Sequence, residues 1–196
     1  MLKLAAAVIA GLVAMGGWAV VTVKDLPEYF VAGRQYTLEF QVRQHGRTLL
    51  SGLHPQLVVT TSEQGPSSTI PAVARPAAGT YAVTFTAPKA ERVFLTIQSG
   101  FRNSELRLPP LPVIAPGATR AAMAEGERGA VLFVAKGCAT CHANEQLTVG
   151  PMLAGRSLAR EYVMEKIKNP ASQIMPDLGL SDAEASAIAA FVSEER

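Results

Sequence analysis

The chain has 196 residues, 48% of them apolar and 17% charged, with 16 Gly and 13 Pro, which is the composition of a globular protein and allows one medium or two small domains. A net charge of +2 gives no indication of nucleic-acid binding. The charge is unevenly distributed, because residues 1–117 carry 10 Lys/Arg against 6 Asp/Glu and residues 118–196 carry 8 against 10. This difference fits two separate units.

The N-terminal segment is apolar apart from Lys3. The uncharged run Leu4–Val23 has 20 residues, about the length that spans a hydrocarbon core, and it predicts a membrane anchor with Lys3 on the cytoplasmic side. If the apolar region ends at Gly16–Gly17, the segment is instead a cleaved signal peptide, and the Val-rich residues 18–23 then predict a first strand. We assign residues 1–19 to this segment, and both interpretations predict an extracytoplasmic protein on the periplasmic side.

Residues 20–107 have the pattern of short strands separated by turn residues. Apolar and polar side chains alternate over 36–43, and Tyr81, Val83 and Phe85 share one face of a second alternating segment. Further strands are predicted in QLVVTTS, VFLTIQSG and SELRL, which are bounded by Gly, Pro and Ser. This pattern predicts an antiparallel β-sandwich.

The pattern changes after residue 107. Residues 108–119 contain four prolines and predict a semi-rigid linker. In 120–196 the spacing becomes helical, and it predicts a first helix in AEGERGAVLFVAKG. A second helix starts at the candidate N-cap Ser157 and ends before Pro170, and a last one is opened by the capping box Ser181–Glu184. The predicted fold class is therefore multidomain, with an N-terminal hydrophobic segment, an antiparallel sandwich and an all-α domain.

Both cysteines of the chain lie in the motif Cys138-Ala139-Thr140-Cys141-His142, which is the spacing of c-type haem attachment. Each thiol can add to one haem vinyl group, and the adjacent His142 can then ligate the iron. A large apolar cofactor also suits a helical domain of about 75 residues, which has a marginal core of its own. Covalent attachment takes place outside the cytoplasm, in agreement with the N-terminal segment.

Other interpretations of the cysteine pair require features that the sequence does not supply. A structural zinc site needs four ligands, so that His45 and His54 would have to come from the other domain. A thioredoxin-like pair is expected in a βαβ unit, and none is predicted here. A disulfide would close too small a loop to stabilise the fold appreciably.

Three methionines after the motif are candidates for the sixth iron ligand. Met164 falls on the apolar stripe of a predicted helix, where core packing is the expected role. Met152 comes 10 residues after His142 and Met175 comes 33 residues after it. We favour Met175, because a chain of that length can reach the far face of the haem and Pro176 would stiffen it, with Met152 as the alternative.

Residues from about 122 to 196 resemble a class I monohaem cytochrome c domain. The resemblance rests on the Cys-x-x-Cys-His motif, on Gly150-Pro151 and on Met175-Pro176, and further matches are Gly129, Phe133, Tyr162, Ile167, Asn169-Pro170 and Phe191. It implies one covalent haem c bound by Cys138, Cys141, His142 and Met175, with Gly150 and Pro151 at the proximal side. It also implies that the Pro151 carbonyl accepts the imidazole N–H.

The N-terminal part resembles immunoglobulin-like sandwich modules of bacterial extracytoplasmic proteins, some of which are associated with copper or oxidase assembly. His45 and His54 are then candidate copper ligands, although polar residues beside Gly46 and Pro55 are also ordinary in turns. The sequence lacks the Met-rich or His-rich clusters that would strengthen a copper site.

An iron with two protein ligands predicts a one-electron carrier rather than an enzyme. We therefore expect an extracytoplasmic electron carrier, or the haem-bearing subunit of a membrane respiratory or photosynthetic complex. Its redox partner proteins are expected to be membrane-bound, and no nucleic-acid partner is expected. Two alternatives remain open at this stage: a haem-based ligand sensor or peroxidase-like protein, and a copper-handling assembly factor. Lys136, Lys166 and Lys168 lie near the haem-binding segments, where we expect a mixed solvated surface rather than a docking site.

Overall fold

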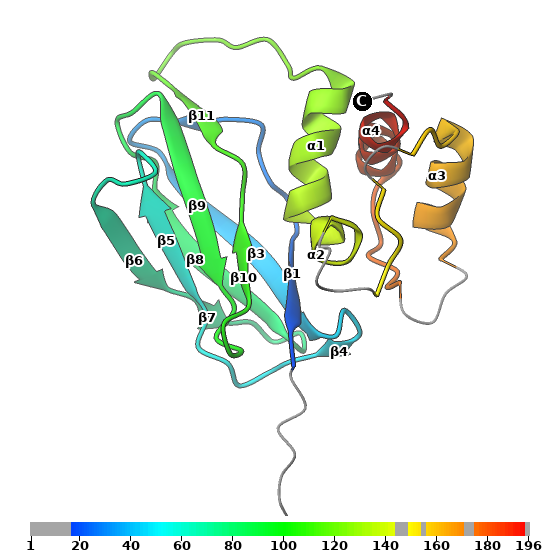
Figure 1. The fold of residues 1–196 in the computed structure, drawn as a ribbon. Helices are drawn as coiled ribbons and strands as arrows, with labels where there is room; N and C mark the ends of the chain where they lie inside the picture. The colour runs from blue at the N-terminus through cyan, green and yellow to red at the C-terminus, as the bar shows by residue number, and fades with distance from the viewer. Residues whose placement is uncertain (1–16, 144–148, 154–155, 171–174, 195–196) are drawn as a thin grey trace, which may run out of the picture.

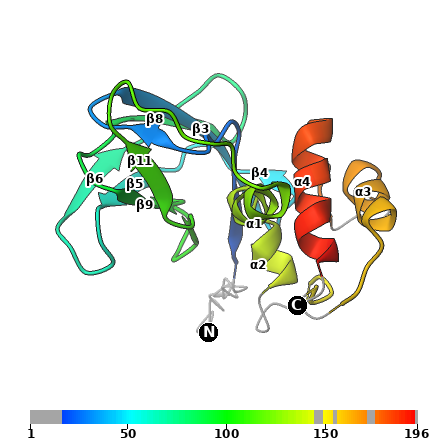
Figure 2. The ribbon, with the colours of Figure 1, turned by 90° about the horizontal axis from the view of Figure 1, so that it is seen from above.

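The computed structural model describes residues 17–143, 149–153, 156–170 and 175–194 (Figure 1). Of these residues, 31% lie in strands and 22% in helices, which form two sheets and four helices. In both ribbon views, helix α1 lies between the sheets and helix α4, and α3 lies on the outer side of α4 (Figure 2).

The first sheet has five strands, all paired antiparallel. Its order is β1(Ala19–Val23), β3(Gln35–Gln44), β8(Thr80–Thr86) and β7(Val73–Ala74), with β4(Thr48–Leu49) also paired to β3. The alternation that predicted β3 and β8 places their apolar side chains inward, so that Phe40 and Phe85 are buried.

The second sheet has six strands in the order β2(Phe30–Val31), β11(Leu111–Ile114), β9(Arg92–Gln98), β5(Gln56–Thr60) and β6(Ser67–Pro71), with β10(Glu105–Arg107) also paired to β9. Side chains from both sheets form one buried cluster, to which Leu38 of the first sheet and Leu95 of the second belong. The strands thus enclose a shared core.

The helices are α1(Glu125–Ala135), α2(Cys138–His142), α3(Arg160–Lys168) and α4(Asp182–Ser193). The capping box predicted for α4 is present, with the Glu184 N–H bound to Ser181 Oγ and the Ser181 N–H bound to the Glu184 carboxylate. The predicted cap at Ser157 is wrong, because α3 starts three residues later and its N-cap is Ala159, which has no capping oxygen.

The predicted fold class is wrong in two respects, the strand directions and the separate all-α unit, and part of the separately predicted linker forms a strand. The strands are not all antiparallel, since β11 pairs with β2 in parallel register, Val113 opposite Phe30. Residues 111–114 do not act as a spacer, because they form β11 inside the second sheet. Nor do the helices form a separate all-α unit, since Val131 and Ala135 of α1 belong to the same buried cluster as the sheet residues.

One of the four prolines of residues 108–119, Pro112, lies within β11. Proline has no N–H to donate, so a strand accepts it where no ladder bond has to be donated. Here the ladder bond comes from the next residue, whose N–H donates to the Glu91 carbonyl at 2.9 Å. Leu111 and Val113 then point into the core while Pro112 and Ile114 are half-buried.

Candidate cofactor site

One pocket of about 390 Å³ lies among the helices, a volume within the range of small-molecule and cofactor sites. All six residues predicted for the site line it: Cys138, Cys141, His142, Gly150, Pro151 and Met175. Most of the other lining side chains are apolar, and they include Phe133, Leu153, Val163, Ile167, Ile188 and Val192. The structure thus brings together residues that are up to 37 positions apart in the sequence.

The end of α1 places the cysteine motif at this pocket. The N–H groups of Lys136 and Gly137 donate to carbonyls of α1, and Gly137 then takes a left-handed conformation with φ 81°, which costs glycine nothing. The chain re-enters a short helix, α2, in which Cys138 and Cys141 are three residues apart and therefore lie on the same side. Both thiols can face one bound group.

The two cysteines form no disulfide with each other, and Cys138 packs against the apolar core cluster of the helices. Burial raises the pKa of the Cys138 thiol to about 12, and it raises the pKa of Cys141 as well. Redox-active cysteine pairs have a lowered pKa, which makes the attacking thiol a thiolate near neutral pH. These thiols are protonated at neutral pH and differ from such pairs.

The imidazole of His142 is held in one orientation. Its Nδ1 lies 2.9 Å from the Pro151 carbonyl oxygen, and because a carbonyl only accepts, Nδ1 must carry the proton. The lone pair is then on Nε2, as a metal-binding imidazole requires. Gly150 leaves room for the ring, since a Cβ there would lie 2.9 Å from His142 Cε1.

The three candidate methionines all lie in the part of the chain that the structure describes, and Met175 is the one of the three that lines the pocket. Met164 packs against the helical core cluster, as its position on the predicted helix stripe indicated. Met152 is half-buried next to Pro151 and does not line the pocket. A thioether from Met175 can therefore face the same space as His142.

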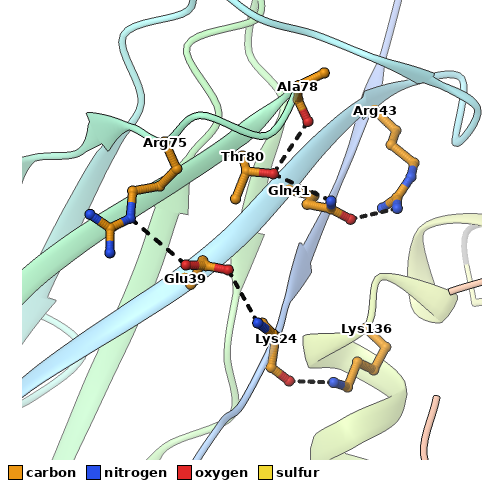
Figure 3. A network of polar contacts seen from close by, with 8 residues as sticks. All are labelled: Lys24, Glu39, Gln41, Arg43, Arg75, Ala78, Thr80 and Lys136. Carbon is orange, nitrogen blue, oxygen red and sulfur yellow. Dashed lines mark hydrogen bonds and ion pairs between the residues drawn. The ribbon is translucent and has the colours of Figure 1, made fainter. Parts of the chain in front are cut away.

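The predicted solvated surface around the lysines needs correction at Lys136. This residue is 4% exposed; its Nζ pairs with Glu184 at 2.6 Å and donates to the Lys24 carbonyl (Figure 3). Lys166 and Lys168 lie at the surface, where they pair with Glu165 and Asp182. Neighbouring carboxylates thus offset both exposed charges.

Sequence reasoning missed two pocket residues that come from the first sheet. Val20 of β1 and Gly46, in the turn between β3 and β4, line the pocket. A signal was present in the sequence of β1, AVVTV, because its apolar residues occur on both faces of the strand. A strand that is apolar on both faces is normally covered on both.

The two histidines outside the motif lie in separate parts of the chain. His45 is in the β3–β4 turn, with its ring 5.5 Å from that of Trp18, and His54 lies between β4 and β5. Over the described ranges, no three His, Cys, Asp or Glu side chains are grouped so that they could hold a metal ion. Over the same ranges, no helix is long and apolar enough to cross a membrane, and residues 1–16, where an anchor or signal peptide is predicted, lie outside them.

Comparisons with known proteins agree on the helical part. Residues 124–192 match the family described as cytochrome c oxidase, cbb3-type, subunit III. Cytochrome c-551 of Pseudomonas aeruginosa is 33% identical over 98 residues, which cover 44% of this chain and 94% of that protein.

Proposed function

Because the chain belongs to the cytochrome c family through its helical part and is a haem-based electron-transfer protein, we propose that it transfers single electrons outside the cytoplasm with one covalently attached haem c. In this proposal His142 and Met175 would hold the haem iron. The observation that carries it is the pocket itself, which two thiols, an oriented imidazole and a thioether line together.

The residues present fit a haem group. The pocket is lined mainly by apolar side chains, as a porphyrin requires, and its polar lining residues include His142, Lys136 and Arg156. The imidazole Nε2 is free to bind iron because Nδ1–H is held by Pro151. Haem c supplies the Fe(II)/Fe(III) couple when it is bound.

Each residue then has a defined task. Cys138 and Cys141 would hold the haem through thioether bonds, since addition of each S–H across a vinyl group needs no oxidant. Gly150 admits the His142 ring, and the Pro151 carbonyl fixes its tautomer. Phe133, Val163 and Ile188 exclude water from the pocket and so favour a high reduction potential.

We further propose that the protein serves a membrane respiratory complex. The matching family is described as an oxidase subunit, and the uncharged run of residues 4–23 supports either a membrane anchor or an export signal. The redox partners would then be membrane-bound proteins that meet the haem-bearing part of the chain in short-lived encounters.

The ligand assignment is tested by the absorption spectrum of the oxidised holoprotein. A far-red sulfur-to-iron band is expected in the wild type, and Met175→Ala should abolish it. Met152→Ala is the matched control, since it removes a neighbouring thioether that does not line the pocket. A band that persists in Met175→Ala, or that disappears in Met152→Ala, would contradict the assignment.

A further inference from the structure

We propose that strand β1 and the β3–β4 turn form one wall of the haem pocket, so that Val20 and Gly46 contact the cofactor. This inference rests on the proposed function in that it places haem in the pocket described above. It gives the sheets a role in the redox site, because they would supply cofactor-contacting residues from outside the cytochrome c family match, which begins at residue 124.

The side chains of β1 divide between two neighbours. Ala19, Val21 and Val23 belong to the core cluster of the sheets. Val20 and Thr22 alternate with them and therefore point to the opposite face, where the helical part lies (Figure 1). Val20 is 5% exposed and lies against Gly137, which precedes the cysteine motif, and against Gly46 of the β3–β4 turn.

Three contacts fix β1 on the residues that precede the cysteine motif. Gly137 lies so close that a Cβ on it would come 2.3 Å from Val20 Cγ1 and 2.9 Å from the Val21 carbonyl oxygen. The Thr22 hydroxyl donates to the Lys136 carbonyl at 3.3 Å. The Lys136 ammonium reaches back to the carbonyl of Lys24 (Figure 3).

The sheet holds the strand end that receives Lys136. The Lys24 N–H donates to the Glu39 carbonyl at 2.8 Å, and the Glu39 side chain pairs with Lys24 and Arg75. Lys136 also pairs with Glu184 in the first turn of α4. The segment that leads into Cys138 is therefore held between the first sheet and α4.

This arrangement brings Val20 to the pocket edge near Cys138. Gly46 lies on the other side of Val20, since a Cβ on Gly46 would be 3.8 Å from Val20 Cγ2. Both residues are buried and both line the pocket. An apolar side chain at this place keeps water from the haem, and water stabilises the more highly charged ferric state, so the wall should raise the reduction potential.

The test compares two substitutions on the same strand in the full-length holoprotein. Val20→Ala removes two methyl groups from the pocket wall, and Val21→Ala removes the same groups from the sheet core. Spectroelectrochemical titration should show that Val20→Ala shifts the Fe(III)/Fe(II) equilibrium about threefold toward the ferric form, or about 28 mV at 59 mV per tenfold for one electron. Val21→Ala should lower the melting temperature and leave the potential within error of wild type.

Val20→Thr and Val21→Thr form a second pair that keeps the side-chain shape, in case truncation prevents folding. A shift for Val20 variants that is no larger than that for Val21 variants would overturn the inference. The Met175→Ala spectrum separates this result from a failure of the proposed function. If the wild type has the far-red band, Met175→Ala loses it and the Val20 variants leave the potential unchanged, the proposed contact of Val20 with the haem is refuted and the proposed function stands.

Discussion

A methyl group at Gly137 should destabilise the protein through two separate effects. Gly137 has φ 81°, and a left-handed conformation costs a residue with a Cβ roughly 1–2 kcal/mol. The new Cβ would also lie 2.3 Å from Val20 Cγ1 and 2.9 Å from the Val21 carbonyl oxygen, so that β1 or the motif has to move. Overpacking of this kind typically costs about 1–3 kcal/mol.

The free energy of unfolding should therefore fall by about 2–5 kcal/mol in Gly137→Ala. Gly117→Ala is the matched control, since Gly117 has φ 82° and nothing within 4 Å of its Cβ position, and it should lose only the strain of about 1–2 kcal/mol. At roughly 2–4 °C per kcal/mol for a chain of this size, calorimetry should resolve the difference.

The double variant Gly137→Ala/Val20→Ala isolates the contact with β1. Removing Val20 Cγ1 relieves the closest approach, so the double variant should be less destabilised than the two single variants together predict. Equal melting temperatures for Gly137→Ala and Gly117→Ala, or strict additivity in the double variant, would show that β1 does not press on the motif.

Three further outcomes are expected, each from one site. Gly129→Ala should lower the unfolding free energy by about 1–3 kcal/mol by overpacking, because the new Cβ would lie 1.9 Å from a carbonyl oxygen of α4. This cost should exceed the gain from the higher helix propensity of alanine, and a stabilised variant in thermal melts would refute the prediction. Tyr81→Phe should lower the free energy of unfolding by about 1–3 kcal/mol in denaturant titrations. The buried Tyr81 hydroxyl donates to the carbonyl of residue 50 and accepts the N–H of residue 53, and an unchanged midpoint would contradict that role. Burial alone would raise the pKa of Glu184, but hydrogen bonds from Lys136 and from residue 181 outweigh it and lower the pKa below its ordinary 4.5. The ionised Glu184 carboxylate therefore stabilises the folded protein above about pH 4.5, and this stabilisation is lost as the pH falls below that value. Glu184→Gln should therefore flatten the decline in stability at acid pH, and an unaltered pH profile would argue against this role of Glu184.

Local patterns predicted those elements whose own residues determine them. The alternation over 36–43 and at Tyr81, Val83 and Phe85 matches strands β3 and β8, because a strand with one buried face shows a period of two. The box Ser181–Glu184 likewise starts α4, since both partners are within one turn.

Features that depend on distant contacts were missed. The prolines of 108–119 indicated a spacer, yet Pro112 sits in β11 where no N–H has to be donated. Lys136 is charged and adjacent to the haem motif, but its burial depends on Glu184 and the Lys24 carbonyl, which no local pattern reveals. Val20 and Gly46 reach the pocket only because β1 docks on residues 136–137.

The cysteine motif was the most informative feature of the sequence, because the spacing of its ligands is itself local. Placing Met175 at the same pocket required a longer argument, from the number of residues after His142, and the structure brings the two to one cavity. Ligation of the iron by Met175 stays a prediction.

The central claim is electron transfer by a haem iron whose two remaining positions are both occupied by protein side chains. The most direct test is a carbon monoxide titration of the reduced full-length holoprotein, followed by absorption spectroscopy. With His142 and Met175 both bound to the iron, the wild type should show no carbon monoxide complex, whereas Met175→Ala should bind the gas readily. Ready binding by the wild type would contradict the account, since an open or exchangeable position would make the protein a ligand-binding haem protein.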